Sequence, residues 1–330
     1  MNKKENQIHL IKQIAVSVAA FVATTSLVCG AGQQASESSR SKAISGLWPR
    51  LGTPVLPTSA GLSAQESPGD PSHPQTTITQ IDVPGDTITY AQGINPRGDI
   101  VGYYIDTDIH GFLLSNGAFT TIDVPGAPGT FAFGINPRGD IVGIYFDSDT
   151  GNPHGFLLSN GAFTTIDPPG AFYTIASGIN RQGDIVGEYI DGGDHGFLLS
   201  NGTFTTIDVP GAIVTAALGI NRQGDIVGYY YDSSFTQHGF LLSNGSFTTI
   251  DVPGATATFA SGINRQGDIV GHSQNSTGNF DGFLLRNGKF ITIDIPGAIG
   301  TDANGIDSRD AIVGDFTDSS GNTHGYLLSR

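Results

Sequence analysis

Short apolar runs separated by turn residues recur along the chain from Thr76 onward. One unit contains the runs Thr89–Asn95, Ile100–Tyr104, His110–Leu114 and Phe119–Asp123. The runs are rich in β-branched and aromatic residues, and none keeps a helical period over ten or more residues. The pattern therefore predicts an all-β protein with four short strands in each unit.

The segments between these runs carry residues that favour tight turns. Asn116-Gly117 separates two apolar runs, and both residues tolerate the positive φ of a two-residue hairpin. The segment Asn95–Asp99 contains Pro followed by Gly, which suits a second tight turn. These turns predict antiparallel strands and argue against a parallel β-helix.

An Ile-Asp-x-Pro-Gly element marks the period of the repeat. Successive elements are 41, 44, 41, 43 and 43 residues apart. A period of this length is typical of arrays in which each unit is one supersecondary element. Four antiparallel strands repeated six times predict a six-bladed β-propeller of four-stranded blades. The aspartates of the element are Asp82, Asp123, Asp167, Asp208, Asp251 and Asp294.

The two ends of the repeat region predict that the ring is closed. The region opens with a fourth run, Thr76–Asp82, and closes with a third run, His324–Ser329. Antiparallel pairing of these two segments would complete the sixth blade, whereas an open solenoid would need distinct capping units. The first run of each unit carries an Ala-x-Gly element, as in Ala91-x-Gly93, whose small residues would let six inner strands crowd the ring axis.

The N-terminal part of the chain has a different composition. Lys3, Lys4 and Lys12 precede an uncharged stretch from Ile14 to Cys29, which predicts a secretory signal peptide over 1–31. The stretch 32–75 is rich in Ser, Pro, Gly and Gln and predicts a flexible linker before a propeller over 76–330. We expect an extracellular or cell-surface protein, with lipidation of Cys29 as an open alternative.

The charge balance limits the classes of partner. The chain has 15 Lys and Arg residues against 30 Asp and Glu residues, and its net charge is -15. Such acidity argues against nucleic acid and anionic membranes as partners, and it suits cations or neutral polar ligands such as glycans. The simpler alternative is that the charge keeps a secreted protein soluble. We expect a monomer that does not insert into a membrane after signal cleavage.

The repeat resembles the HAF-type family of extracellular repeats, which is named for a His-Ala-Phe triplet. The matching pieces are Gly-Ile-Asn, Gly-Asp-Ile-Val-Gly, the His-Gly-Phe-Leu region and Phe-Thr-Thr-Ile-Asp-x-Pro-Gly, and they recur over residues 76–330. This chain has Gly inside the triplet, as in His110-Gly111-Phe112, and Asp281 replaces the histidine of the fifth unit. The resemblance implies an exported repeat protein and supplies no catalytic residues.

The variable loops and the Pro-Gly-Ala loops are predicted to share one face, where propellers usually bind ligands. We expect each repeated histidine to hydrogen-bond within its own blade, with ligand binding as the alternative. The loop that contains Asp147, Asp149 and Asn152 has oxygen ligands at a calcium-like spacing. It lacks the remaining acidic ligand of a known calcium loop, Asp-rich loops often form simple turns, and no other cofactor is predicted. The candidate ligand-binding residues are His110, His154, His195, His238, His272, Asp281 and His324.

Few polar positions break the similarity of the six units. They are Glu188, His272, Gln274, Asp281 and Asp302, and the fifth unit is the most divergent. No phosphate loop, nucleophile elbow, zinc motif or cysteine nucleophile is present. The leading interpretation is a binding or scaffold module for a glycan or a protein. The alternatives are a polysaccharide-directed hydrolase or lyase that uses the propeller funnel, and a structural matrix component, so catalysis stays an open question.

Overall fold

The computed structural model describes residues 77–86 and 88–329. The predicted signal peptide (1–31), with Cys29, and the predicted linker (32–75) lie outside the described residues. The described chain is built from 24 β-strands. It contains no helix whose length and hydrophobicity would let it span a bilayer.

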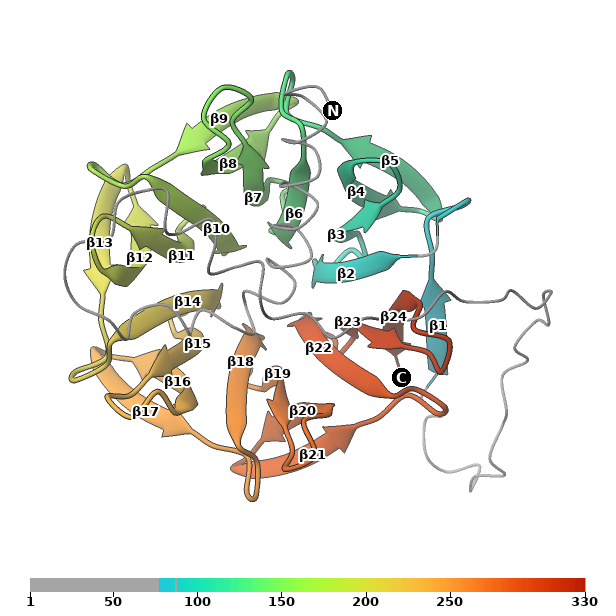
Figure 1. Cartoon of the computed structure of the whole chain (residues 1–330), viewed down its shortest axis with the longest axis vertical. Helices are drawn as coiled ribbons and strands as arrows, with labels where there is room; N and C mark the ends of the chain where they lie inside the picture. The colour runs from blue at the N-terminus through green and yellow to red at the C-terminus, as the bar shows by residue number, and fades with distance from the viewer. Residues whose placement is uncertain (1–76, 87, 330) are drawn as a thin grey trace, which may run out of the picture. The chain divides into compact units, whose positions relative to one another are not determined.

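The strands form six antiparallel four-stranded meanders, the blades, arranged in a ring (Figure 1). The third and fourth blades are linked into one sheet by a single parallel bridge between Asp194 and Val214. The all-β propeller predicted from the repeat is therefore confirmed. In order from the inner to the outer strand, the first three blades are β2 (Thr89–Ile94), β3 (Ile100–Ile105), β4 (Ile109–Ser115) and β5 (Ala118–Ile122); β6 (Thr130–Ile135), β7 (Ile141–Phe146), β8 (Pro153–Ser159) and β9 (Ala162–Ile166); and β10 (Tyr173–Ile179), β11 (Ile185–Ile190), β12 (Asp194–Ser200) and β13 (Thr203–Ile207).

The last blade combines strands from both ends of the described chain. Strand β1 (Thr77–Ile81) pairs antiparallel with β24, from Thr77 opposite Ser329 to Ile81 opposite Gly325. This is the pairing that the phase of the repeat predicts. The remaining blades are β14 (Val214–Ile220), β15 (Ile226–Tyr231), β16 (Gln237–Ser243) and β17 (Ser246–Ile250); β18 (Ala257–Ile263), β19 (Ile269–Gln274), β20 (Phe280–Arg286) and β21 (Lys289–Ile293); and β22 (Gly300–Ile306), β23 (Ile312–Thr317), β24 (Thr323–Ser329) and β1.

Glycines allow the inner strands to touch around the axis. A Cβ atom on Gly93 would lie 2.6 Å from the carbonyl oxygen of Phe133 in the next blade. A Cβ atom on Gly305, in the last blade, would lie 2.9 Å from the carbonyl oxygen of Gln92 in the first blade. A side chain at these positions would force the inner strands apart. The inner position predicted from the Ala-x-Gly elements is confirmed.

Apolar side chains fill the spaces between the blades. The phenylalanine of each His-Gly-Phe triplet is almost fully buried, as Phe156 and Phe197 show with no exposed surface. It packs with residues of the neighbouring blade, so that Phe156 shares a cluster with Val101 and Ile122. Six such clusters stabilise the ring. No cluster is large, and the stability of each blade depends on its neighbours.

The two faces of the ring differ in their loops. The turn face carries the tight turns that follow the first and third strands of each blade, and the loop face carries the connections that follow the second and fourth strands. On the turn face Asp99 accepts hydrogen bonds from Ser115 (2.6 Å) and Asn95 (2.9 Å), while Arg97 donates to the carbonyl of Pro137 in the next blade (2.7 Å). The Gly-Asp elements are therefore architectural.

Candidate functional site

The repeated histidines lie on the outer part of the loop face and bond within their blades. The Nδ1 atom of His110 lies 3.0 Å from Asp123, and that of His154 lies 2.7 Å from Asp167. His195 and His238 form the same contact with Asp208 and Asp251, and His324 forms it with Asp82, which directly follows strand β1. The geometry agrees with the structural interpretation. A ligand-binding role for this set stays a prediction.

The carboxylate of Asp147 is engaged by its own loop. Its Oδ1 atom accepts hydrogen bonds from the backbone N–H of Asp149 (2.9 Å) and from the backbone N–H and hydroxyl of Thr150 (2.7 and 2.9 Å). The bonds from Thr150 are the largest cause of a lowered pKa at Asp147. The described residues contain no group of three or more His, Cys, Asp or Glu side chains placed to hold a metal ion. The calcium interpretation of Asp147, Asp149 and Asn152 stays a prediction.

Differences between the blades concentrate in one layer of side chains between neighbouring blades. Each blade contributes one residue from its first strand and one from its second strand, directly opposite each other in the register. In the first blade these residues are Tyr90, which precedes Ala91, and Tyr103, which follows Gly102. The Ala and the Gly recur in every blade, whereas the two residues next to them change from blade to blade. The pairs are Tyr90 and Tyr103, Phe131 and Ile144, Ile175 and Glu188, Ala216 and Tyr229, Phe259 and His272, and Asp302 and Asp315.

The layer becomes acidic where the fifth, sixth and first blades meet. His272 Nδ1 lies 3.6 Å from Asp302 Oδ1 across the boundary between the fifth and sixth blades. Asp302 faces Asp315 on the adjacent strand. Asn304 donates one hydrogen bond to Asp315 (2.8 Å) and one to the carbonyl of Ala91 in the first blade (3.1 Å). We refer to His272, Asp302 and Asp315 as the acidic cluster.

Aromatic rings enclose the acidic cluster. Tyr90 and Tyr103 of the first blade stack with their centroids 4.5 Å apart, and Phe259 lies 4.3 Å from the ring of His272. Tyr326 stands where the other five blades have phenylalanine, and its side chain is fully buried. Burial, followed by the charge of Asp315, raises the pKa of Tyr90 to about 12. These rings make a low-dielectric wall against which charges in the cluster act strongly.

The two carboxyl groups of the cluster differ in exposure. Burial raises the pKa of Asp315 well above its ordinary value, the charge of Asp302 raises it further, and the hydrogen bond from Asn304 opposes both. Asp302 keeps 32% of its side chain exposed. Asp315 therefore favours its protonated form more strongly than an ordinary aspartate does. Asp302 Oδ1, His272 Nδ1 and the Tyr326 hydroxyl are buried atoms with no hydrogen-bond partner among the described residues.

A second ionisable group of the same layer lies between the third and fourth blades. Burial, with a smaller effect of the charge on Asp194, raises the pKa of Glu188 to about 7. The hydroxyl of Tyr229 in the fourth blade donates to Glu188 Oε2 at 3.4 Å and opposes the shift. Glu188 therefore changes charge near neutral pH without any partner of opposite charge in these contacts.

Replacing Glu188 by glutamine is expected to remove part of the pH dependence of stability. Folded Glu188 holds its proton more tightly than an unfolded glutamate, so its contribution is complete below about pH 4.5 and is lost as the pH rises through about 7. The shift corresponds to at most about 3 kcal/mol, reduced by solvent screening. In urea unfolding between pH 4 and 9, the free energy of unfolding of Glu188→Gln should increase relative to that of wild type only at the higher pH values. If the free energies of unfolding of wild type and Glu188→Gln changed with pH in parallel, the raised pKa of Glu188 would be contradicted.

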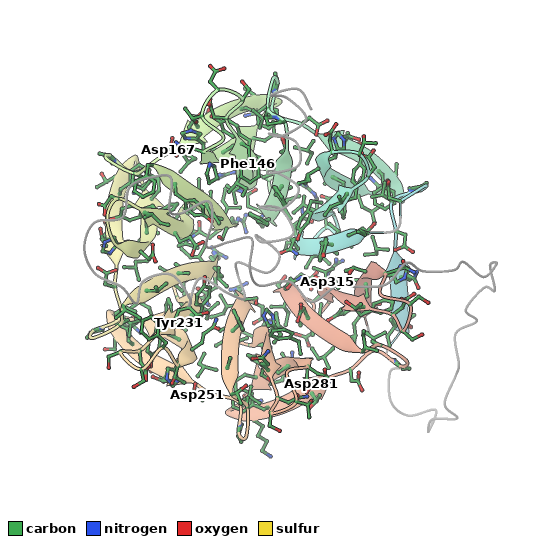
Figure 2. The ribbon with its side chains drawn as sticks, in the orientation of Figure 1. Phe146, Asp167, Tyr231, Asp251, Asp281 and Asp315 are labelled. Atoms are coloured by element: carbon green, nitrogen blue, oxygen red, sulfur yellow. The ribbon has the colours of Figure 1, made fainter. Side chains whose placement is uncertain are left out.

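The structure brings together only some of the asymmetric residues predicted from sequence. His272 and Asp302 meet, and Glu188 lies in the same layer in another part of the ring. Asp281 accepts a hydrogen bond from Asn275 (3.1 Å) and lies farther from the ring axis than Asp315 (Figure 2). Gln274 donates to the carbonyl of Gly278 within its own loop.

Sequence reasoning missed Asp315, Asn304 and Tyr326. Asp315 occupies the position that holds Tyr103 in the first unit and Tyr229 in the fourth. An alignment of the six units therefore shows Asp315 as an acidic exception. Tyr326 was visible as the final residue of His-Gly-Tyr, but only the fold places its hydroxyl near two carboxyl groups.

No protein-family model and no curated protein matches the chain. Among solved structures, virginiamycin B lyase from Staphylococcus aureus is 10% identical with a TM-score of 0.46, and the match covers 78% of this chain and 100% of that one. TolB from Acinetobacter baumannii is 15% identical with a TM-score of 0.48 and coverages of 75% and 65%. The Aleuria aurantia lectin is 13% identical with a TM-score of 0.47 and coverages of 73% and 91%. Likeness at this level says nothing about a ligand of this chain.

Proposed function

We propose that this chain is an exported β-propeller that binds a glycan on its loop face, at the mouth of the acidic cluster. The proposal of export is supported by the signal-like N-terminus and by the resemblance to extracellular HAF-type repeats. The observation that carries the binding proposal is the concentration of non-repeated polar residues at one point of a ring that is otherwise built from close copies.

The geometry of the cluster suits the recognition of polar groups. The exposed part of Asp302 offers an acceptor at the surface, the buried carboxyl group of Asp315 lies opposite it, and aromatic rings flank both. Sites with a few convergent polar groups among apolar side chains are typical of small-ligand recognition. A scaffold without a ligand would gain nothing from unpaired polar atoms at this position, because each one costs about 1–3 kcal/mol of stability.

The second candidate function is catalysis on a polysaccharide by the same residues. It is favoured by the pairing of Asp315, a buried carboxyl group with a raised pKa, with the more exposed Asp302, because two carboxyl groups in different environments can divide the acid and base roles. In that case Asp302 would take a proton from the substrate or water, and His272 would orient it.

A saccharide array followed by titration calorimetry tests the proposal. Wild type should give saturable binding to at least one saccharide, and Asp302→Asn should weaken it about tenfold or more, since one charge-assisted hydrogen bond is lost. Asp310→Asn is the matched control on the turn face and should bind like wild type. Absence of saturable binding to every saccharide would refute the proposal. Release of shortened saccharides during the incubation, abolished in Asp302→Asn, would favour the enzyme.

A further inference from the structure

The two faces of the ring carry different charge. All eight Arg and Lys residues of the described chain lie on the turn face, in or beside its tight turns. Seven carboxylates accompany them there. The other 19 described Asp and Glu residues lie in the loops and strand ends of the loop face, apart from Glu188, Asp302 and Asp315, which lie inside strands. The basic residues are Arg97, Arg138, Arg181, Arg222, Arg265, Arg286, Lys289 and Arg309.

This separation has consequences for ligands. On the loop face no described Lys or Arg is present to balance the carboxylates, and histidines are the only side chains there that can become cationic. A field of one sign attracts cations and repels anions from that face. Acidic polysaccharides, phosphates and sulfated glycans are therefore poor ligands for this site.

The acidic cluster has polar atoms that need a partner. His272 keeps only 10% of its side chain exposed, and its Nδ1 is aimed at Asp302 at 3.6 Å, beyond hydrogen-bond distance. The hydroxyl of fully buried Tyr326 also has no partner among the described residues. Asp302 remains the member of the cluster that a ligand can reach. A positively charged group of a ligand would form a charge-assisted hydrogen bond with Asp302, which is stronger than the bond that a neutral hydroxyl would form.

Exposed apolar side chains lie on the same face. Phe172, Ile213 and Ile299 each follow a Pro-Gly-Ala loop and keep 54%, 42% and 58% of their surface exposed. Each stands immediately before or at the start of the inner strand of its blade. Of these three residues, Ile299 precedes the strand that carries Asp302 and offers apolar contact area in the same blade.

We infer that the loop face recognises saccharides that carry free ammonium groups, with one ammonium group at Asp302 in the acidic cluster. This inference rests on the proposed glycan-binding function and specifies its ligand class. The cationic group neutralises Asp302, and further ammonium groups along the saccharide interact with the carboxylates of the surrounding loops.

The test compares β-1,4-linked glucosamine tetrasaccharide with its fully N-acetylated counterpart on the full chain at pH 6, by calorimetry at two salt concentrations. We expect the amino form to bind at least tenfold more tightly, with an affinity that falls as salt rises. Asp302→Asn should reduce this preference at least tenfold. Asp310→Asn makes the same charge change on the turn face, where Asn tolerates the positive φ of 67°, and should keep the preference.

The outcomes separate the inference from the function on which it rests. Equal or tighter binding of the N-acetylated form would overturn the ammonium assignment and leave glycan binding intact. Binding of tetralysine as tight as that of the amino sugar, unaffected by Asp302→Asn, would overturn it in favour of unspecific charge attraction. If neither tetrasaccharide nor any other saccharide of the array is bound, the proposed function fails together with the inference.

Discussion

Replacing Gly143 by alanine is expected to destabilise the propeller by at least about 3 kcal/mol. Gly143 lies in the second strand of the second blade, and a Cβ atom there would meet the carbonyl oxygen of Phe131 and come within 2.8 Å of the ring of Phe156. The first contact involves backbone, so rotation of a side chain cannot relieve it. The paired strands β6 and β7 would have to separate, with loss of hydrogen bonds next to a fully buried aromatic residue. Urea unfolding monitored by far-ultraviolet circular dichroism measures the change in the free energy of unfolding.

Gly129 in the same blade provides the control. Its nearest neighbours to a new Cβ atom are Phe146 at 3.5 Å and Ile109 at 3.6 Å, which are ordinary contacts. Gly129→Ala should therefore change stability by no more than about 0.5 kcal/mol. If Gly143→Ala were as stable as Gly129→Ala, the close approach of strands β6 and β7 at Gly143 would be contradicted.

Replacing Ile81 by alanine is expected to lower the free energy of unfolding by about 2–4 kcal/mol. Ile81 is the last residue of strand β1 and is 5% exposed, in a cluster with Phe112 and Val313. Its loss leaves a cavity at the point where the first and last blades meet, and it weakens the strand that covers the edge of β24. The midpoint of urea unfolding and the onset of aggregation on heating both report on this closure.

The matched substitution on the same strand is Ile78→Ala. Ile78 is 38% exposed and makes the same kind of backbone pairing with β24 as Ile81 does. Its replacement should shift stability by about 0.5 kcal/mol or less. Equal and small effects of both substitutions would mean that β1 is dispensable, and the closed ring would lose its main energetic support.

The candidate site was less visible in the sequence than the fold. The five repeated histidines are conspicuous because they recur, yet each one bonds to the aspartate that follows the fourth strand of its own blade. His272 and Asp302 were noticed as exceptions, but nothing in their spacing of 30 residues indicated contact. Asp281 was noticed for the same reason and bonds to Asn275 instead.

The sequence by itself determined the period, the four strands of each unit, the turns and the closing phase of the ring, because these depend on local patterns and on the copying of one unit. His-Gly-Phe and Asn-Gly recur often enough to define strands and hairpins without any tertiary contact. Only the tertiary structure decided which non-repeated residues meet. Asp315 lies beside Asp302 because two strands pair, and His272 approaches Asp302 because the ring brings the fifth blade against the sixth. The distances between residues of different blades depend on how the blades pack, and the order of residues along the chain does not specify these distances.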